Sequence, residues 1–205
     1  MGGAMIAPIT NEQISAAGGV LARAFHVDPL TTYMVPDPEA RAQALPVFYE
    51  AAIRLAQRFG EAIVTTGEIA GAALWFPPGT VELGPKHFEA VGAGNLGERL
   101  PIGAFDRFGS VMEHLDGLRS RDVPGPHWYL AVLGVEPLRQ GRGIGSALVR
   151  PIFERADSAS VACYLETQKS DNVPLYRHLG FEVVVEPVEP KSRIQFWTML
   201  RRPRR

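Results

Sequence analysis

The chain has 205 residues, enough for one sizeable hydrophobic core, and we expect a single domain over residues 1–205. Hydrophobic residues make up 46% and charged residues 21%, which is typical of a soluble globular protein and not of a disordered or fibrous one. The formal net charge of −1 offers no broad basic surface, so nucleic-acid binding is not expected. We interpret "RRPRR" at residues 201–205 as a frayed, solvated end.

Cysteine usage and the N-terminus indicate the compartment. The single Cys163 excludes an internal disulfide and favours a reducing compartment, so the cytoplasm is the expected location, and a thiol in the middle of an apolar strand should be inert. Residues 1–10 lack the features of a signal peptide, and we interpret "MGGA" as a start or expression remnant. No apolar run approaches the ~20 residues of a membrane span. The histidines show no metal-ligand spacing, so no metal is expected.

The first half of the chain predicts two helices, a hairpin and an insertion. Apolar residues at spacings of three and four predict a helix over residues 12–26, and a second helix should run from residue 40 to Gly60. The proline-rich residues between them predict an exposed loop. Residues 61–79 predict a hairpin, and residues 82–125 a glycine-rich helical insertion, whose best helix covers residues 105–119.

The second half predicts an alternation of strands and helices. "HWYLAVLGV" at residues 127–135 is apolar throughout, as in a central strand that is covered on both faces. A helix that is kinked at Pro151 should start at Ser146, and a strand should follow at residues 161–167. The last predicted elements are a short helix closed by Gly180 and a hairpin of residues 181–187 with residues 193–200.

The loop "RQGRGIGSALV" joins the central strand to the helix at Ser146 and places glycines at alternate positions 141, 143 and 145. A strand, a glycine turn and a helix in this order direct backbone N–H groups and a helix N-terminus at an anion. Residues 136–150 also contain three arginines against one glutamate. We therefore expect the loop to bind phosphate.

Two common phosphate loops do not fit the spacing, because the Gly-Lys-Ser/Thr ending of a Walker loop and the G-x-G-x-x-G rule are both absent. The remaining pattern, Gln140-x-x-Gly143-x-Gly145, together with "NVPLYRHLGF" at residues 172–181, resembles the GNAT superfamily of acyl-CoA-dependent N-acetyltransferases. The resemblance covers residues 127–200 well and extends to the puromycin N-acetyltransferase branch. The first 126 residues match only in outline.

The resemblance implies an α/β (α+β) fold with a mixed, mostly antiparallel sheet and helices on both faces. Acetyl-CoA would be the co-substrate and would enter where the strand ending at Glu136 and the strand ending at Thr167 diverge. The reaction would be acetyl transfer to a primary amine of a small molecule. The alternatives are a protein N-terminus or lysine as acceptor, or a catalytically silent acyl-CoA-binding module. The oligomeric state stays open, with a homodimer as one option.

Several residues are candidates for cofactor binding. The loop would hold the pyrophosphate with Arg139, Gln140, Gly141, Arg142, Gly143, Gly145 and Ser146. Asn172 and Tyr176 are four residues apart and therefore share one helix face, where the resemblance implies contact with the pantetheine arm and sulfur. For Asn172 a helix N-cap is an equally good and compatible interpretation. Backbone N–H groups of Leu133 or Val135 would hold the carbonyl oxygen.

Two side chains are candidates for proton transfer. Tyr176 is the expected proton donor to the thiolate, because a phenol stays protonated at neutral pH and the family's motif places its acid there. The alternative is an aromatic residue packed in the core. Glu166 is the candidate base, because strand alternation groups it with Ala162 and Tyr164, and apolar neighbours would raise its pKa. The alternative is a solvated strand end.

The acceptor pocket is the least determined part of the site. The resemblance assigns it to the loop between the first two helices, where Asp28 and Asp37 would attract an ammonium group and Tyr33 and Met34 would contact it. Both aspartates precede a proline, so a simple turn role is the alternative. Trp75 either lines the pocket or belongs to the core. If the loop is not involved, the insertion at residues 82–125 is the next place to look.

Overall fold

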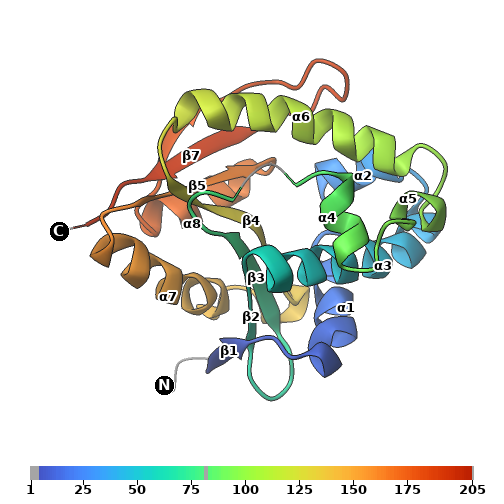
Figure 1. Ribbon diagram of the computed structural model, residues 1–205, viewed down its shortest axis with the longest axis horizontal. Helices are drawn as coiled ribbons and strands as arrows, with labels where there is room; N and C mark the ends of the chain where they lie inside the picture. The colour runs from blue at the N-terminus through green and yellow to red at the C-terminus, as the bar shows by residue number, and fades with distance from the viewer. Residues whose placement is uncertain (1–4, 81–82, 205) are drawn as a thin grey trace.

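The computed structural model describes residues 5–80 and 83–204, and these contain one seven-stranded sheet with the strand order β1-β2-β3-β4-β5-β7-β6 (Figure 1). Neighbouring strands are antiparallel except β4 and β5, which are parallel. The predicted mixed, mostly antiparallel sheet is therefore confirmed. The strands are β1 (Ile6–Pro8), β2 (Glu61–Thr65), β3 (Gly71–Phe76), β4 (His127–Val135), β5 (Ala162–Thr167), β6 (Glu182–Val185) and β7 (Trp197–Arg201).

The helices lie between successive strands along the chain. The longer ones are α1 (Ile14–Ala24), α3 (Pro38–Phe59), α6 (Ala104–Asp122) and α7 (Ile144–Ser158). The shorter ones are α2 (Pro29–Met34), α4 (Pro85–Ala90), α5 (Leu96–Arg99) and α8 (Val173–His178). Short 3-10 turns are η1 (Asn11–Gln13), η2 (Pro137–Arg139) and η3 (Ser170–Asn172). None of the helices in the described part of the chain is long and apolar enough to cross a membrane.

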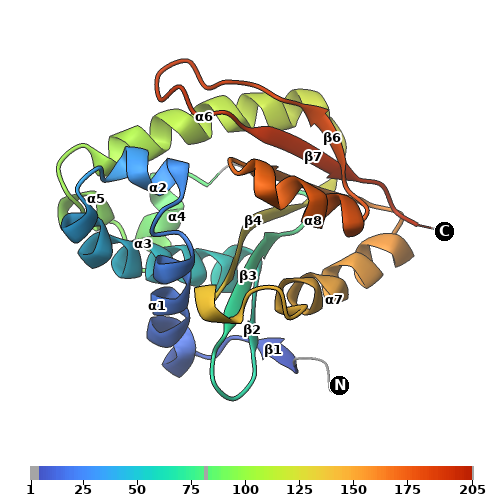
Figure 2. The same cartoon turned by 180° about the vertical axis from the view of Figure 1, so that it is seen from behind.

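The sheet separates two hydrophobic cores, and alternation along β3 shows how. Ala72 and Leu74 face the core that includes α1 and α3, whereas Ala73 and Trp75 face the core that includes α7 and α8. Figures 1 and 2 show α3 and α7 on opposite sides of the sheet and α6 lying along β7. A third, smaller cluster joins α6 to Ile194 and Phe196, just before β7. Helices thus cover both faces, as predicted.

Most predicted elements are present, with differences at their ends. The first two helices, the hairpin of β2 and β3, the central strand β4, and the final pair β6 and β7 are all found. The stretch predicted to be a helical insertion contains α4, α5 and α6. Strand β1 was not predicted, because three residues are too short to show alternation. Helix α7 begins at Ile144, two residues earlier than expected, since Gly143 already occupies its N-cap position.

The prediction of an exposed loop over residues 27–40 is wrong, because this stretch contains α2 and the start of α3. Pro29 and Pro38 each occupy the first turn of a helix, and Asp28 and Asp37 cap those helices with their side chains. Helix α2 lies between them with buried residues on its inner side. A proline that breaks one helix has the φ angle needed to start the next one.

The interpretation of residues 201–205 as a frayed, solvated end is wrong at Arg201, whereas the Arg202 side chain is exposed as expected. The Arg201 side chain is only 3% exposed and donates two hydrogen bonds of 2.7 Å to the Asp157 carboxylate. The backbone N–H of Arg204 donates to the same carboxylate at 2.8 Å. Strand β7 thus extends into the basic segment and is anchored to α7. The interpretation of "MGGA" concerns residues outside the described part.

Candidate active site

The sheet opens between β4 and β5. Their registered pairs run from His127 and Ala162 to Tyr129 and Tyr164, although both strands continue beyond that point. On its other side β4 has a bulge, because Leu130 lies opposite Trp75 whereas Val132 lies opposite the adjacent Leu74. Ala131 is therefore an extra residue, and a bulge bends its strand and increases the local twist. The bulge lies where the pairing with β5 ends, so β4 turns away from β5 there.

The hydrogen bonds of β4 reveal which backbone groups face this opening. The N–H of Glu136 donates to the Ala70 carbonyl at 2.8 Å, toward β3. In an antiparallel pair the bonded residues alternate, so Leu133 and Val135 direct their N–H and C=O groups away from β3. The Val135 carbonyl indeed accepts a 3.1 Å bond from Gln140 Nε2 on that side. The N–H groups of Leu133 and Val135 therefore face the opening.

The glycine loop brings a helix N-terminus to the same place. Gly141 and Gly143 have φ angles of 74° and 77°, in the left-handed region, and Gly143 is the N-cap of α7. Gly145 lies in the first turn of α7, where an added Cβ would be 3.7 Å from the Leu133 side chain. The N–H groups of that turn have no partners within the helix. The N-terminus of α7 therefore adjoins the part of β4 that contains Leu133 and Val135.

The side chains of the loop have mixed roles. Arg139 forms an ion pair with Glu68 in the turn between β2 and β3, and Gln140 fastens the loop to Val135. Arg142 is exposed and makes a 3.4 Å bond to the Leu138 carbonyl, while Ser146 lies half-buried in the first turn of α7. Backbone donors, a helix N-terminus and an exposed arginine are suited to an anion such as the pyrophosphate of a nucleotide cofactor.

Helix α8 closes the opposite side of the opening. The Asn172 side chain donates to Thr167 Oγ1 at 3.1 Å and makes no capping bond, although Asn172 occupies the N-cap position. It therefore ties α8 to the end of β5. Tyr176 is buried, and its ring packs edge-on against Phe181 at 5.9 Å between centroids. Burial and, next, the negative charge of Asp28 raise the pKa of Tyr176 above its usual range.

Asp28 links the first helices to this region. Its side chain caps α2 through the Leu30 N–H at 3.0 Å and also accepts a bond from Gln168 Nε2, just after β5. The residue is only 2% exposed, and burial raises the pKa of its carboxyl. Its charge acts on both Tyr176 and the buried Tyr49. The structure thus brings Asp28 and Tyr176 together, two residues that the sequence predicted for different roles.

The other candidates for the acceptor pocket lie apart from each other. Tyr33 is half-buried and packs beside α6, against the cluster that includes Val111 and Leu115. Trp75 is fully buried on the α7 side of the sheet, edge-on to Trp128 and Phe153. This is the environment of a core residue, which is the alternative that the sequence left open for Trp75. Asp37 caps α3 at the surface.

Glu166 lies near the end of β5 on the face that α6 covers. Burial raises the pKa of Glu166 to about 7, and the charge of Arg119 acts in the opposite direction. Its Oε1 atom is buried without a hydrogen-bond partner among the described residues. Tyr164 shares its strand face, and Arg119, Asp116 and Tyr129 add charged and polar neighbours. Sequence analysis missed these residues, although the three-residue spacing of Asp116, Arg119 and Asp122 places them on one side of a helix.

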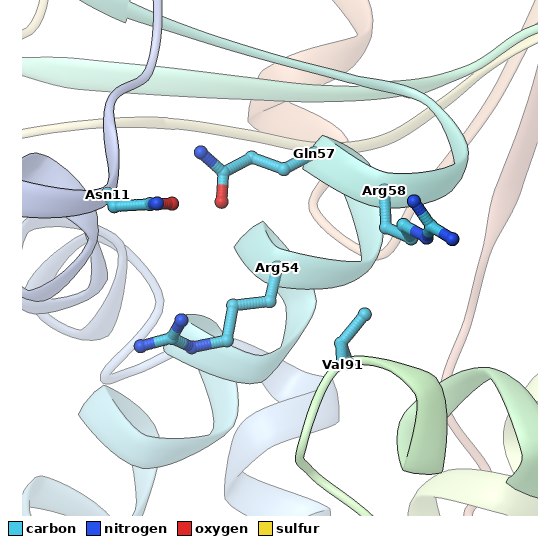
Figure 3. A pocket seen from close by; sticks show the side chains of 5 residues that line it. All are labelled: Asn11, Arg54, Gln57, Arg58 and Val91. Carbon is cyan, nitrogen blue, oxygen red and sulfur yellow. The ribbon is translucent and has the colours of Figure 1, made fainter.

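Two further observations concern sites elsewhere. Cys163 is fully buried, and burial raises the pKa of its thiol to about 12, which suits an inert thiol. No group of three His, Cys, Asp or Glu side chains in residues 5–80 and 83–204 is placed to hold a metal ion. A shallow pocket is lined by Asn11, Arg54, Gln57, Arg58 and Val91, and Figure 3 shows the guanidinium groups of its two arginines pointing away from each other. None of its residues belongs to β4, β5, α7 or α8.

Comparison with known proteins decides the family. Residues 28–181 match the model of the acetyltransferase (GNAT) family, which covers the opening, the loop and α8. The chain belongs to the GNAT family. Its members use acetyl-CoA as co-substrate, and this chain is an acyl-CoA-dependent N-acetyltransferase. The opening between β4 and β5 suits the thioester of that co-substrate. The glycine loop and the N-terminus of α7 suit its pyrophosphate.

Relatives of this GNAT acetyltransferase match different shares of its length. An uncharacterized N-acetyltransferase of Schizosaccharomyces pombe is 28% identical over 172 residues, which is 80% of this chain and 69% of the relative. The N-alpha-acetyltransferase RimI of Mycobacterium tuberculosis is 29% identical over 103 residues, 50% of this chain and 58% of the relative. A mycobacterial mycothiol acetyltransferase is 34% identical over 91 residues, 40% of this chain and 30% of the relative.

Solved structures similar to this GNAT acetyltransferase support its fold. A Corynebacterium glutamicum protein, described as histone acetyltransferase HPA2 and related acetyltransferase, has a TM-score of 0.71 and 24% identity and covers 100% of this chain and 98% of its own. Drosophila melanogaster polyamine N-acetyltransferase has a TM-score of 0.62 and 18% identity, and the match covers 97% of this chain and 99% of the Drosophila chain. At such identities the likeness establishes the fold and not the acceptor.

Proposed function

We propose that this GNAT acetyltransferase transfers the acetyl group of acetyl-CoA to a primary amine of a small cationic molecule. The main support for this proposal is the position of Glu166. It lies beneath α6 and beside the opening between β4 and β5, and one of its carboxylate oxygens has no hydrogen-bond partner among the described residues. Because α6 and the segment before β7 cover this side, a small amine fits better than a folded protein surface. The resemblance of the C-terminal motifs to puromycin N-acetyltransferases also favours a small acceptor.

Acetyl-CoA is held by the opening and the glycine loop. Acetyl-CoA supplies the acetyl group on a thioester, whose C–S bond breaks as the C–N bond to the amine forms. The loop from Arg139 to Ser146 binds the pyrophosphate, mainly with backbone N–H groups and with Arg142 beside them. Asn172 keeps α8 against the end of β5, where the pantetheine arm would pass. The N–H groups of Leu133 and Val135 stabilise negative charge on the carbonyl oxygen.

Two side chains on opposite faces of β5 handle the protons. Glu166 faces α6, while its neighbour Leu165 shares a core with Tyr176 on the α8 side. Glu166 accepts a proton from the amine, and a pKa of about 7 leaves it partly ionised at neutral pH. Tyr176 donates its hydroxyl proton to the departing sulfur. The amine then arrives from the α6 side, and the sulfur leaves toward α8.

Helix α2 forms the wall of the acceptor site in this proposal. Asp28 is a buried carboxylate whose charge acts on Tyr176, and Tyr33 lies on the same helix, beside α6. A carboxylate and an aromatic ring together favour an ammonium group. The amine is therefore expected to carry a second positive charge or an extended polar group.

The release of CoA in the presence of different amines tests the proposal. The panel contains polyamines, guanidino amines, arylalkylamines and aminoacyl amides, and as the rival class it contains peptides with a free N-terminus or an internal lysine. We expect at least one small amine to exceed every peptide tenfold or more in kcat/KM. Higher kcat/KM with peptides would make the chain a protein acetyltransferase, and acetyl-CoA binding without turnover would make it a silent binding module.

A further inference from the structure

A cluster of ionisable side chains lies between α6 and the sheet, beside Glu166. Helix α6 contributes Asp116, Arg119 and Asp122, whose side chains are 24%, 15% and 2% exposed. Tyr129 of β4 and Tyr164 of β5 contribute hydroxyl groups from the sheet. The proposed acetyl transfer gives these α6 side chains no role of their own.

Arg119 is held rigidly within the cluster. Its guanidinium pairs with the Asp116 carboxylate and lies over the Tyr129 ring, 4.2 Å from the ring centroid. Its Nη1 atom is buried without a hydrogen-bond partner among the described residues. A guanidinium keeps its proton at neutral pH, so these two contacts place a permanent positive charge beneath α6.

After burial, the charge of Arg119 is the largest influence on the pKa of Glu166, and it opposes the effect of burial. Burial, Asp116 and Asp122 all raise the pKa of Glu166, whereas the charge of Arg119 and a bond from Tyr129 lower it. The charge of Glu166 in turn acts on Tyr164, its neighbour on the same strand face. Asp122 is already engaged, because its Oδ2 accepts bonds from Thr198 Oγ1 at 2.7 Å and from the Tyr164 hydroxyl at 3.2 Å. Tyr129 pairs with Tyr164 across β4 and β5, so the ring beneath Arg119 lies beside the strand face that carries Glu166.

We propose that Arg119 is a positioning residue that favours the ionised form of Glu166 while leaving its Oε1 atom free, so that helix α6 sets the pH range of the proposed acetyl transfer. Both Arg119 Nη1 and Glu166 Oε1 lack partners among the described residues, so these two atoms are not bonded to each other. Arg119 therefore acts on Glu166 through space. A direct bond would occupy the oxygen that must receive the proton of the amine.

The pH dependence of kcat/KM tests this inference, which rests on the proposed role of Glu166 as base. In the parent enzyme the acidic limb should have its midpoint near pH 7. Arg119→Gln should move this midpoint upward by about one pH unit, because the stabilising charge is lost. Activity at pH 7 should then fall about fivefold and recover near pH 9. Arg119→Lys keeps the charge and should restore most of the midpoint.

A matched control separates this effect from a general loss of charge. Arg202→Gln removes one positive charge from an exposed ion pair with Glu182, and its profile should match the parent. Thermal unfolding of each variant verifies that it is folded. An unchanged midpoint in folded Arg119→Gln, or a lysine variant that behaves like the glutamine variant, would overturn the inference.

A second readout does not require turnover. The carboxyl carbon of Glu166 can be titrated by NMR in the protein labelled with carbon-13 at glutamate side chains, with Glu166→Gln identifying the signal. Its midpoint should rise in Arg119→Gln and return in Arg119→Lys. If no amine is acetylated, the proposed function fails, whereas this titration still decides whether Arg119 controls Glu166. A midpoint that stays the same in all variants would refute the role of Arg119.

Discussion

At the residue scale, the glycine loop depends on two backbone conformations that side chains rarely adopt. Gly143 has a φ angle of 77°, and an added Cβ would meet open space. The obstacle to a side chain there is backbone strain together with obstruction of whatever binds in front of α7. Gly92, in the turn after α4, has a φ angle of 71° and equally open surroundings. The two glycines therefore have similar backbone conformations and similar space around them, but only Gly143 lies in the glycine loop.

Gly143→Val should weaken acetyl-CoA binding at least tenfold, which corresponds to about 1.4 kcal/mol. Valine at a positive φ strains the N-cap of α7, and its side chain obstructs the backbone donors. Gly92→Val imposes the same kind of strain far from the loop, so it should lower the unfolding temperature similarly and leave binding unchanged. Isothermal titration calorimetry measures both affinities. Equal affinities in the two variants would remove the loop from the binding site.

Tyr176→Phe should keep acetyl-CoA affinity and reduce kcat by a factor of ~10²–10⁴, the usual contribution of a positioned proton donor. Phenylalanine keeps the packing against Phe181 and removes only the hydroxyl group. Tyr49→Phe is the matched control, because Tyr49 is also buried and also lies in the field of Asp28. Steady-state kinetics and binding measurements decide. A loss below threefold, with acetyl transfer rate-limiting, would make Tyr176 a packing residue.

At the scale of elements, α2 shows that one sequence pattern can have two environments. Asp28-Pro29 and Asp37-Pro38 are both an aspartate N-cap followed by a proline in the first turn. Asp28 is buried against Gln168, near Tyr176, whereas Asp37 is exposed at the start of α3. Local sequence determines the cap in both cases, but only packing of distant segments brings Asp28 to the end of β5 and close to Tyr176.

Asp28→Asn should raise KM for the amine several-fold and leave KM for acetyl-CoA nearly unchanged. Asparagine is an equally good N-cap, so α2 keeps its start and only the charge is lost. The pattern of a raised KM with unchanged kcat indicates lost ground-state binding. Asp37→Asn makes the same replacement at an exposed cap and should leave both constants unchanged. An unaltered amine KM in Asp28→Asn would move the acceptor pocket away from α2.

The sequence predicted features that depend on short stretches of the chain and missed features that depend on contacts between distant segments. The glycine loop, Tyr176 and most helices and strands follow from periodicity and motif spacing over short stretches. The bulge at Ala131 leaves no such sign, because an extra residue in an apolar strand does not change its composition. Arg201 resembles a disordered tail until β7 pairs with β5 and brings it to Asp157. These features arise from strand register and from contacts between distant segments.

At the scale of the whole molecule, the region around Glu166 combines segments from distant parts of the chain. Helix α6 supplies Arg119, β4 supplies Tyr129, and β5 supplies Glu166 itself. Burying a carboxylate among other acids costs free energy of folding. In the proposed function, the same burial gives Glu166 the pKa of a base that works at neutral pH. The proposed function and the stability of the fold are therefore opposed at this position.

Glu166→Gln should consequently stabilise the protein at pH 8 while it abolishes most activity. The pKa of Glu166 is about 7 in the fold and about 4.5 when unperturbed, so between these values the folded state holds a proton that the unfolded chain has released. The stability contributed by that proton is complete below about pH 4.5, declines as the pH rises, and is lost above about 7. Glutamine has no charge, so the variant is free of this ionisation cost.

Urea unfolding at several pH values measures the difference. The free energy of unfolding of Glu166→Gln should exceed that of the parent by up to about 3 kcal/mol at pH 8 and by progressively less toward pH 5. Glu182→Gln, at an exposed ion pair, should show no such trend. A Glu166→Gln variant that is less stable than the parent at pH 8 would mean that the carboxylate is held by favourable contacts and is not under strain from burial.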